Sequence, residues 1–191
     1  IDNPNRTQSH AVNLAAEMAS GINSVRHLVR VDAHADYPAN FVSDLLDTLE
    51  REGADSVVIP MKTVGGNKVP NAAALLYNSW LGHGGSAHRS GKFRGFVEHG
   101  HHAAFRLAAY RSIGGYDVRF AANEDGEFDM RFTKAGYRIF LENKVTIRYV
   151  PRDSYAAFWK QMLRNGRHRV MTSMKHGVPL GKRQLLPIAV A

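Results

Sequence analysis

Two side chains that could hold a divalent metal ion follow a short apolar run of the sequence. Residues 27–31 favour a strand because apolar and β-branched residues dominate them, and Pro38 keeps a helix from starting earlier. Asp32 and His34 stand two apart on this extended segment, so both side chains point the same way and could share one ion. A loop acid beside a solvated histidine is the simpler interpretation of an isolated Asp-x-His, and the pattern alone leaves both open.

Glu124 and Asp125 form an acidic pair at the expected start of a helix that ends at Gly136. An acid in the first turn of a helix is favoured by the helix dipole, so Asp125 could serve only as a cap. The same carboxylate could act as a general base that removes a proton from a hydroxyl group. These residues by themselves do not choose between the two roles.

A basic stretch near the carboxyl end could bind phosphate groups. Arg164, Arg167 and His168 follow a helix expected to begin at residue 153 or 154, and guanidinium groups bind phosphate through paired hydrogen bonds. A solvated basic helix end is the alternative. The helix itself carries an apolar stripe that we expect to pack in the core: Tyr155, Phe158, Trp159, Met162 and Leu163.

Two other segments contain residues that often bind ligands. Residues 98–102 (Glu-His-Gly-His-His) suggest zinc, but they lack a His-Glu-x-x-His helix and their glycine breaks the helical register. Accidental clustering is therefore the favoured interpretation. Residues 82–91 are rich in glycine without the spacing of a P-loop, which favours a flexible loop over a phosphate cradle.

The composition narrows the classes of function. The 191 residues suffice for one domain with a sizeable core, and 44% hydrophobic and 22% charged residues are typical of globular proteins. The sequence has no cysteine, which excludes disulfides, thiolate zinc sites and cysteine nucleophiles, so any metal must be bound by oxygen and imidazole. A net charge of +8 favours phosphate-bearing substrates, nucleic acid or an anionic membrane surface.

Helices and strands alternate along the chain, which predicts an α/β fold with a mostly parallel sheet flanked by helices. Ligands bind such sheets at the carboxyl ends of the strands, where Asp32 and His34 lie. We expect helices over 8–19, 41–49, 72–81, 106–113 and 130–135, besides the last one, and strands over 27–31, 55–60, 137–141 and 145–149.

Taken in order, the motifs resemble those of inverting family 2 glycosyltransferases of the GT-A fold, in particular the succinoglycan-biosynthesis type of bacterial exopolysaccharide glucosyltransferases. The resemblance extends from Asn3 to about Leu186. It rests on Asn3-Pro4 with Ser9 and Asn13-Leu14-Ala15, Val31-Asp32-Ala33-His34, Gly114-Gly115-Tyr116-Asp117, Glu124-Asp125, Gly136-Tyr137-Arg138-Ile139 and Arg164-x-x-Arg167.

The resemblance implies roles for the matched residues. Asp32 and His34 fill the family's D-x-D position, where Mn²⁺ or Mg²⁺ bridges the two phosphates of the donor, and manganese accepts an imidazole more readily than magnesium does. Asp125 falls on the catalytic base that deprotonates the acceptor hydroxyl. Substrate binding is expected of Asn13, Glu124, Arg164, Arg167 and His168, the last of which stands where the family has tryptophan.

The implied function is metal-dependent transfer of a sugar, with glucose expected, from a nucleotide-sugar such as UDP-glucose to a saccharide or lipid-linked acceptor in bacterial polysaccharide biosynthesis. The implied place is the cytoplasmic side of the inner (plasma) membrane. Nucleic acid is not an expected partner, because no binding motif accompanies the basic charge. We expect residues 1–175 to form a partial GT-A domain that lacks its N-terminal strand and binds UDP weakly, and residues 176–191 to lead toward a membrane region.

Two alternatives remain open from the sequence. A metal-dependent phosphoesterase could use Asp32, His34, Asp36 and the histidines of residues 99–102. A catalytically inactive GT-A-like binding fragment would keep the fold without the activity.

Overall fold

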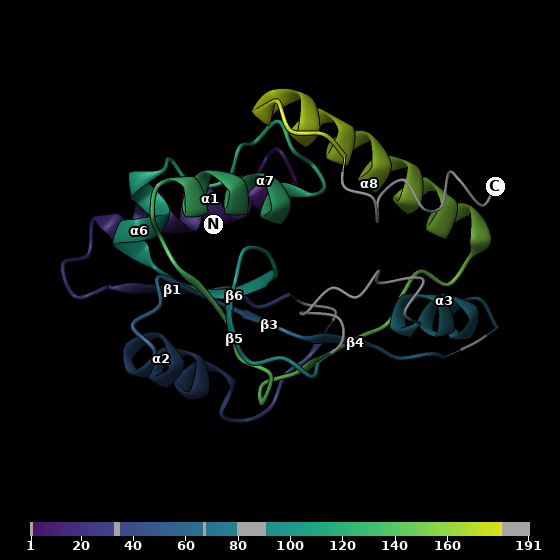
Figure 1. Ribbon diagram of the computed structural model, residues 1–191, viewed down its shortest axis with the longest axis horizontal. Coiled ribbons are helices and arrows are strands. Elements are labelled where there is room, and N and C mark those ends of the chain that lie inside the picture. The colour runs from purple at the N-terminus through teal and green to yellow at the C-terminus, as the bar shows by residue number, and fades with distance from the viewer. Residues whose placement is uncertain (1, 33–34, 67, 80–90, 181–191) are drawn as a thin grey trace.

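The computed structural model describes residues 2–32, 35–66, 68–79 and 91–180. Five strands form a central sheet with helices on both faces (Figure 1). These strands are β1 (His27–Val29), β3 (Ser56–Ile59), β5 (Gly95–Val97), β6 (His101–Arg106) and β7 (Ile139–Leu141). A second sheet contains β2 (Ala35–Asp36), β4 (Met61–Thr63) and β8 (Ile147–Tyr149), in the order β2-β8-β4. The predicted α/β class is confirmed.

The direction of the strands differs from the prediction. The central sheet has the order β1-β6-β3-β7-β5, and among its pairings in the described residues only that of β3 with β7 is parallel. The expectation of a mostly parallel sheet was wrong because it assumes that a helix joins each strand to the next. β5 and β6 are separated only by residues 98–100, and β6 runs antiparallel to both β1 and β3.

Each face of the central sheet carries its own core. Side chains alternate along a strand, so Val58 packs on one face while Val57 and Ile59 pack on the other. Leu45 and Leu49 of α2 cover the second face. The helices around the sheet are α1 (Gln8–Ser20), α6 (Leu107–Ser112) and α7 (Glu124–Lys134) on the first face and α2 (Phe41–Arg51) on the second (Figure 1).

Several predicted helix ends are confirmed, and glycine explains them. Gly53 follows α2 with φ of 59°, and Gly136 follows α7 with φ of 88°, which are left-handed conformations that end helices at little cost.

The predicted loop at residues 82–91 lies outside the described residues except for Gly91, and residues 181–191 lie outside them as well. Within the described parts of the chain, no helix is both long and apolar enough to cross a membrane.

The last helix differs most from its prediction. α8 runs from Tyr155 to His176 and ends only at Gly177 (φ 64°), so the basic stretch around Arg164 lies in its middle rather than beyond its end. The apolar stripe is not core: Tyr155, Trp159 and Leu163 are 70%, 65% and 58% exposed. Helical periodicity shows which residues share a face but not which face meets the protein, and here another face does.

α8 and α3 (Lys68–Asn78) lie side by side away from the central sheet (Figure 1). The Tyr77 ring packs on Phe158 with 5.8 Å between ring centroids, and the Tyr77 hydroxyl lies 3.6 Å from Met162 Sδ. The two members of the stripe that do find contacts, Phe158 and Met162, therefore bind α8 to α3.

Gly114 and Gly115 form a turn between α6 and the segment that leads to α7. Their φ angles of 79° and 65° are ones that glycine adopts without strain. A Cβ atom on Gly115 would also lie 2.5 Å from Asn13 Oδ1. That oxygen accepts hydrogen bonds from Tyr116 N at 2.9 Å and Tyr110 OH at 2.6 Å, and Asn13 Nδ2 donates to Tyr116 O at 2.8 Å. The turn therefore fixes Tyr116 against α1.

Replacing Gly115 with alanine should lower the free energy of unfolding by about 1–3 kcal/mol, because alanine resists the positive φ and its Cβ displaces Asn13. Gly166→Ala is the matched control: Gly166 lies within α8 with open space around it, so alanine should stabilise the chain by up to about 1 kcal/mol. Urea unfolding measures both. Equal effects of the two substitutions would contradict the role assigned to the turn.

Candidate active site

Arg30 and Asp125 form an ion pair at the centre of the candidate site. Arg30 follows β1 and Asp125 lies in the first turn of α7. Arg30 Nη1 donates to Asp125 Oδ1 at 2.9 Å, and their side chains are only 5% and 15% exposed. The Tyr116 hydroxyl donates to the same carboxylate oxygen at 2.6 Å and accepts from Arg30 Nη1 at 3.1 Å. A pair so far from water needs such additional hydrogen bonds to offset its lost hydration.

These contacts keep the Asp125 carboxylate ionised. Burial alone would raise the pKa of Asp125, but the charge of Arg30 and a hydrogen bond from His101 hold it well below its usual value. Burial alone would lower the pKa of Arg30, and the charges of Asp125 and Tyr116 hold it well above its usual value. At neutral pH, Asp125 is therefore an ionised carboxylate.

His101 and Asp32 lie on the other side of Arg30. The ring nitrogens of His101, the first residue of β6, are 3.0 and 3.2 Å from Arg30 Nη2. His101 Nε2 lies 3.8 Å from Asp32 Oδ2, and His101 Nδ1 lies 3.7 Å from Asp125 Oδ2. Burial, followed by the charge of Arg30, lowers the pKa of His101. A neutral imidazole and a guanidinium thus separate the carboxylates of Asp32 and Asp125.

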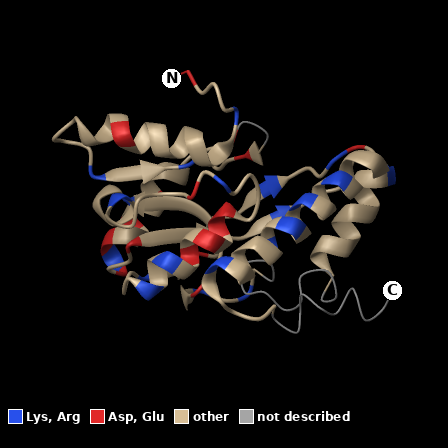
Figure 2. Ribbon diagram, turned by 90° about the horizontal axis from the view of Figure 1, so that it is seen from above, with Lys and Arg blue, Asp and Glu red and all other residues tan. Residues whose placement is uncertain are grey.

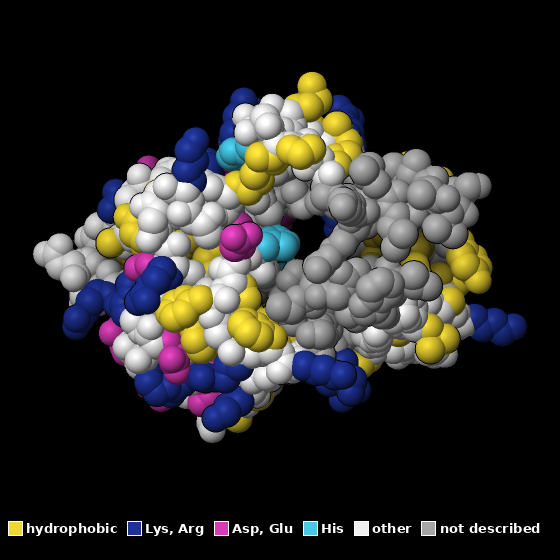
Figure 3. Space-filling view, in the orientation of Figure 1, with side chains coloured by type: hydrophobic (Ala, Val, Ile, Leu, Met, Phe, Trp, Pro, Cys, Tyr) yellow, Lys and Arg dark blue, Asp and Glu magenta, His cyan; other side chains and the backbone are white. Residues whose placement is uncertain are grey.

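Asp125 borders a cavity of about 140 Å³ at the amino end of α7. Burial, and then the charge of Asp125, raises the pKa of the neighbouring Glu124 to about 7. In Figure 3 the surface is hollowed beneath α8, with acidic and histidine side chains beside the hollow. The described residues that line the cavity are Met61, His99, Gly100, His101, Asn123, Glu124, Asp125 and Gly126.

Asn123 connects this cavity to α8. It precedes α7 in a left-handed conformation with φ of 57°, which asparagine tolerates better than most residues. Its side-chain nitrogen donates to Thr172 Oγ1 at 2.9 Å. Strained backbone of this kind often occurs at functional sites, and here it directs the start of α7 toward the cavity.

Asp129, one turn after Asp125, holds two of the histidines. Its buried carboxylate accepts from His99 Nδ1 at 2.5 Å and from Gly100 N at 3.3 Å, and it bonds His102 Nε2 as well. On the other side of its ring, His102 Nδ1 lies 2.7 Å from Ser56 Oγ. Burial alone would lower the pKa of His99, but the hydrogen bond to Asp129 raises it. This network fastens the start of β6 to α7.

The cluster at 98–102 is therefore organised and not accidental, contrary to our expectation, although it is no zinc site in the described residues. Glycine at position 100 made the segment look irregular in the sequence, whereas in the structure the Gly100 N–H reaches the Asp129 carboxylate. His99 and His102 bind Asp129 rather than Asp32, and among the described histidines of this segment it is His101 that lies near Asp32.

The other predicted substrate-binding residues lie apart from the cavity lining. Arg164 and Arg167 are exposed on α8, and His168 is buried with its ring 5.9 Å from that of Phe120. Burial, and then the charges of Arg167 and Arg164, lowers the pKa of His168. Asn13 contributes to the site indirectly, because its side-chain amide forms hydrogen bonds with the backbone of Tyr116.

Asp32 is the described member of the predicted metal-binding pair. His34 lies outside the described residues, and within the described ranges no three acidic or histidine side chains are grouped for metal binding. Mg²⁺ sites often use one or two carboxylates and complete their coordination with substrate phosphates and water. Asp32 is 20% exposed, and its Oδ1 accepts from Gln8 Nε2 at 3.0 Å. Its carboxylate is thus partly accessible to solvent.

Comparison with known proteins identifies the family. The model of Glycosyl transferase family group 2 matches residues 27–168. The chain belongs to this glycosyltransferase family. It is also 45% identical over 192 residues to the succinoglycan biosynthesis protein ExoA of Rhizobium meliloti (strain 1021), in an alignment that covers 100% of this chain and 57% of that protein. The chain thus spans just over half the length of that relative.

The family match encloses every residue of the Arg30–Asp125 site described above except Gln8 and Asn13. A central sheet flanked by helices is consistent with a GT-A-like family 2 glycosyltransferase domain, as the motifs predicted. The same motifs predicted Asp32 and Asp125, which the structure brings together around Arg30.

Three residues of this site received no role in glycosyl transfer from the sequence: Arg30, Tyr116 and His101. A signal existed for Arg30, since an arginine directly after an apolar strand and two residues before an acid must find a partner if it is buried. Tyr116 belongs to the Gly-Gly-Tyr-Asp motif but resembles any core aromatic. No local pattern shows that β6 brings His101 beside β1.

Glu124→Gln should change how stability depends on pH. A glutamate in the unfolded chain ionises near pH ~4.3, whereas folded Glu124 has a pKa of about 7. The wild-type chain therefore loses stability as pH rises from 4.3 to 7, because only the unfolded state ionises freely in that window. Relative to wild type, Glu124→Gln should gain on the order of 1–3 kcal/mol between pH 4.5 and 7.5.

Urea unfolding at several pH values measures this difference, with Glu17→Gln on the exposed side of α1 as the control that should not show it. A pH-independent difference between Glu124→Gln and wild type would contradict a raised pKa.

Proposed function

We propose that this chain forms catalytic machinery of a glycosyltransferase that moves a sugar from a nucleotide-sugar donor to the hydroxyl group of a saccharide acceptor during exopolysaccharide synthesis. Membership of family 2 and similarity to a succinoglycan biosynthesis protein support this class of reaction. The observation that carries it is the ionised Asp125, which borders a cavity and has the Asp32 carboxylate across Arg30 and His101.

In this proposal Asp125 is the general base. The acceptor hydroxyl binds to Asp125 and loses its proton to the carboxylate as its oxygen attacks the anomeric carbon of the donor sugar. Attack from the face opposite the leaving diphosphate inverts the anomeric configuration. Arg30 and Tyr116 keep Asp125 ionised and oriented, so that the base needs no prior deprotonation at neutral pH.

Asp32, with His34 two residues on, is the proposed anchor for the donor diphosphate through Mn²⁺ or Mg²⁺. Such an ion supplies positive charge that neutralises the leaving diphosphate. UDP-glucose is the donor that we propose, because the motifs resemble those of exopolysaccharide glucosyltransferases. Arg164 and Arg167 are proposed to meet the diphosphate when substrate is bound.

Asp125→Asn should lower UDP release from UDP-glucose by on the order of 10²-fold or more, because the amide keeps the shape of the side chain but cannot take the proton. The assay uses the complete reading frame in membranes with added Mn²⁺. Asp47→Asn is the control, since Asp47 is an exposed carboxylate on α2 and should leave the rate unchanged. Equal rates for wild type and Asp125→Asn would refute Asp125 as base, and no release in wild type would favour an inactive binding fragment.

We also propose that α8 lies against the anionic cytoplasmic surface of the bacterial inner membrane, where a lipid-linked acceptor would be presented. Exposed apolar residues recur along one stripe of α8, and Lys and Arg recur along the same helix (Figure 2). An apolar stripe with basic flanks is typical of helices that lie in the interface of a bilayer. The stripe consists of Tyr155, Trp159, Leu163, Val170 and Met174, flanked by Lys160 and Arg169.

Trp159→Ser combined with Leu163→Ser should reduce binding of the chain to phosphatidylglycerol vesicles about 10-fold or more, because the helix loses two apolar side chains that would be buried in the bilayer. Co-sedimentation measures the bound fraction, and neutral phosphatidylcholine vesicles should bind wild type weakly. The control is Val42→Ser, which removes an exposed apolar side chain from α2. Unchanged sedimentation of the double variant would overturn the membrane proposal.

A further inference from the structure

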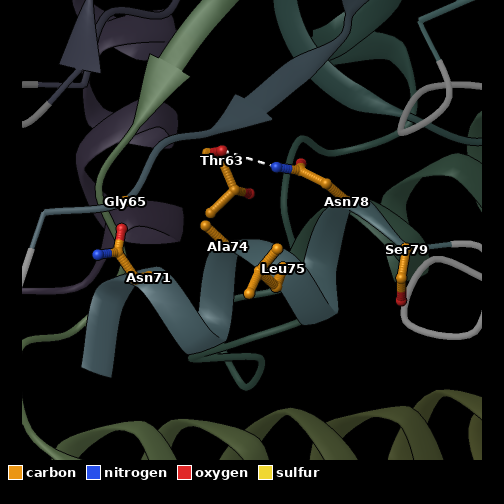
Figure 4. A pocket seen from close by; sticks show the side chains of 7 residues that line it. All are labelled: Thr63, Gly65, Asn71, Ala74, Leu75, Asn78 and Ser79. Carbon is orange, nitrogen blue, oxygen red and sulfur yellow. Dashed lines mark hydrogen bonds between the residues drawn. The ribbon is translucent and has the colours of Figure 1, made fainter. Parts of the chain in front are cut away.

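A second and larger hollow lies beside the candidate active site, between the end of β4 and one face of α3 (Figure 4). Its volume of about 640 Å³ lies in the range usual for small-molecule sites. Asn71, Ala74, Leu75 and Asn78 face it from α3 at the spacing of a single helical stripe. Thr63 and Gly65 line it from the side of β4, and Ser79 closes the described lining.

The lining has the chemistry of a site for a neutral polar molecule. Its described side chains are amides, hydroxyls and small apolar groups, with no charged group among them. A phosphate or carboxylate would find no positive partner there, whereas the hydroxyl groups of a sugar match amides and hydroxyls. Leu75, 76% exposed on the same wall, offers an apolar surface for the carbon-bound hydrogens of a sugar ring.

The Thr63 hydroxyl is the strongest indication of a ligand. Thr63 is 2% exposed, yet its Oγ1 has no hydrogen-bond partner among the described residues. Buried hydroxyls are nearly always paired, because an unpaired one costs free energy. Its backbone oxygen accepts from Asn78 Nδ2 at 2.8 Å, which fixes Asn78 in the hollow and leaves the Asn78 carbonyl oxygen to meet a ligand.

Gly65 keeps the hollow open at this end. A Cβ atom on Gly65 would overlap the Asn71 side-chain oxygen, so a larger residue would push Asn71 out of its present place. Asn71 Nδ2 donates to Gly66 O at 3.3 Å, which holds the amide beside the hollow. The arrangement resembles a built site more than a gap left by poor packing.

β4 links this hollow to the cavity that borders Asp125. Met61 lines the cavity of Asp125, and Thr63 lines the hollow. One residue lies between them, so both side chains extend from the same face of the strand, roughly 6–7 Å apart along it. That spacing is of the order of one sugar unit.

We infer that the hollow between β4 and α3 binds the second sugar unit of the acceptor, while the first presents its hydroxyl to Asp125. The assignment rests on the proposed function for the identity of the ligand as acceptor. It predicts that a disaccharide is bound better than a monosaccharide, and that the donor does not compete for this place.

Saturation-transfer NMR on the full chain tests the inference without requiring catalysis, with cellobiose and methyl β-glucoside as probes. With the wild-type chain, the saturation-transfer signal of cellobiose should be stronger than that of the glucoside. Thr63→Val should reduce the cellobiose signal at least 5-fold. Thr63→Val should not lower the unfolding temperature, since its hydroxyl makes no hydrogen bond. Thr146→Val is the matched control, because the Thr146 hydroxyl bonds only within the turn before β8.

Three other outcomes would overturn the inference. Equal cellobiose signals in wild type and Thr63→Val, or no signal in wild type with either probe, would refute a saccharide site at Thr63. Displacement of cellobiose by UDP-glucose would assign the hollow to the donor sugar instead. A wild-type chain that binds cellobiose through Thr63 but releases no UDP would refute the proposed function and leave the binding site standing.

Discussion

The buried pair of Arg30 and Asp125 is the interaction on which the rest of the site depends. Withdrawing the two charges from water costs several kcal/mol per ion, and their attraction offsets this only in good geometry with further hydrogen bonds. Tyr116 and His101 supply those bonds, and each is itself fixed: Tyr116 by Asn13 and the Gly114–Gly115 turn, His101 by its place in β6. Loss of any one of these would leave a charge buried without its full set of partners.

The two acids at the start of α7 are adjacent in sequence and opposite in behaviour. Asp125 faces a guanidinium, and its pKa is held well below the usual value, whereas burial and the charge of Asp125 raise the pKa of Glu124 to about 7. Divergence of this kind separates a carboxylate that is ionised in the resting site from a group that exchanges a proton near neutral pH. Asn123, in a left-handed conformation directly before these two acids, connects the start of α7 to α8 through its hydrogen bond to Thr172.

Sequence reasoning succeeded where local physics decides the outcome. Glycine in the left-handed region ended α2 and α7 as expected, and the continuous apolar run at 57–59 lies in the buried strand β3. It failed where partners come from far along the chain. β6 begins with two histidines after a glycine, a pattern that does not predict a strand, yet it lies between β1 and β3 in the sheet. The apolar stripe on α8 has a clear helical period, but the orientation of the helix depends on its contact with α3. Asp32 and Asp125 were found through motifs, while Arg30 and His101 needed the fold.

The position of β6 in the sheet has a consequence for how the chain acquires its structure. β6 pairs with β1, more than seventy residues earlier, and with β3, more than forty residues earlier. Contacts between such distant segments form slowly, because a long loop must close before they contribute. During synthesis on the ribosome, β1 and β3 must therefore remain without their central partner until residue 106 has left the exit tunnel. Until then their unpaired edges are exposed, which favours association with other chains in that interval.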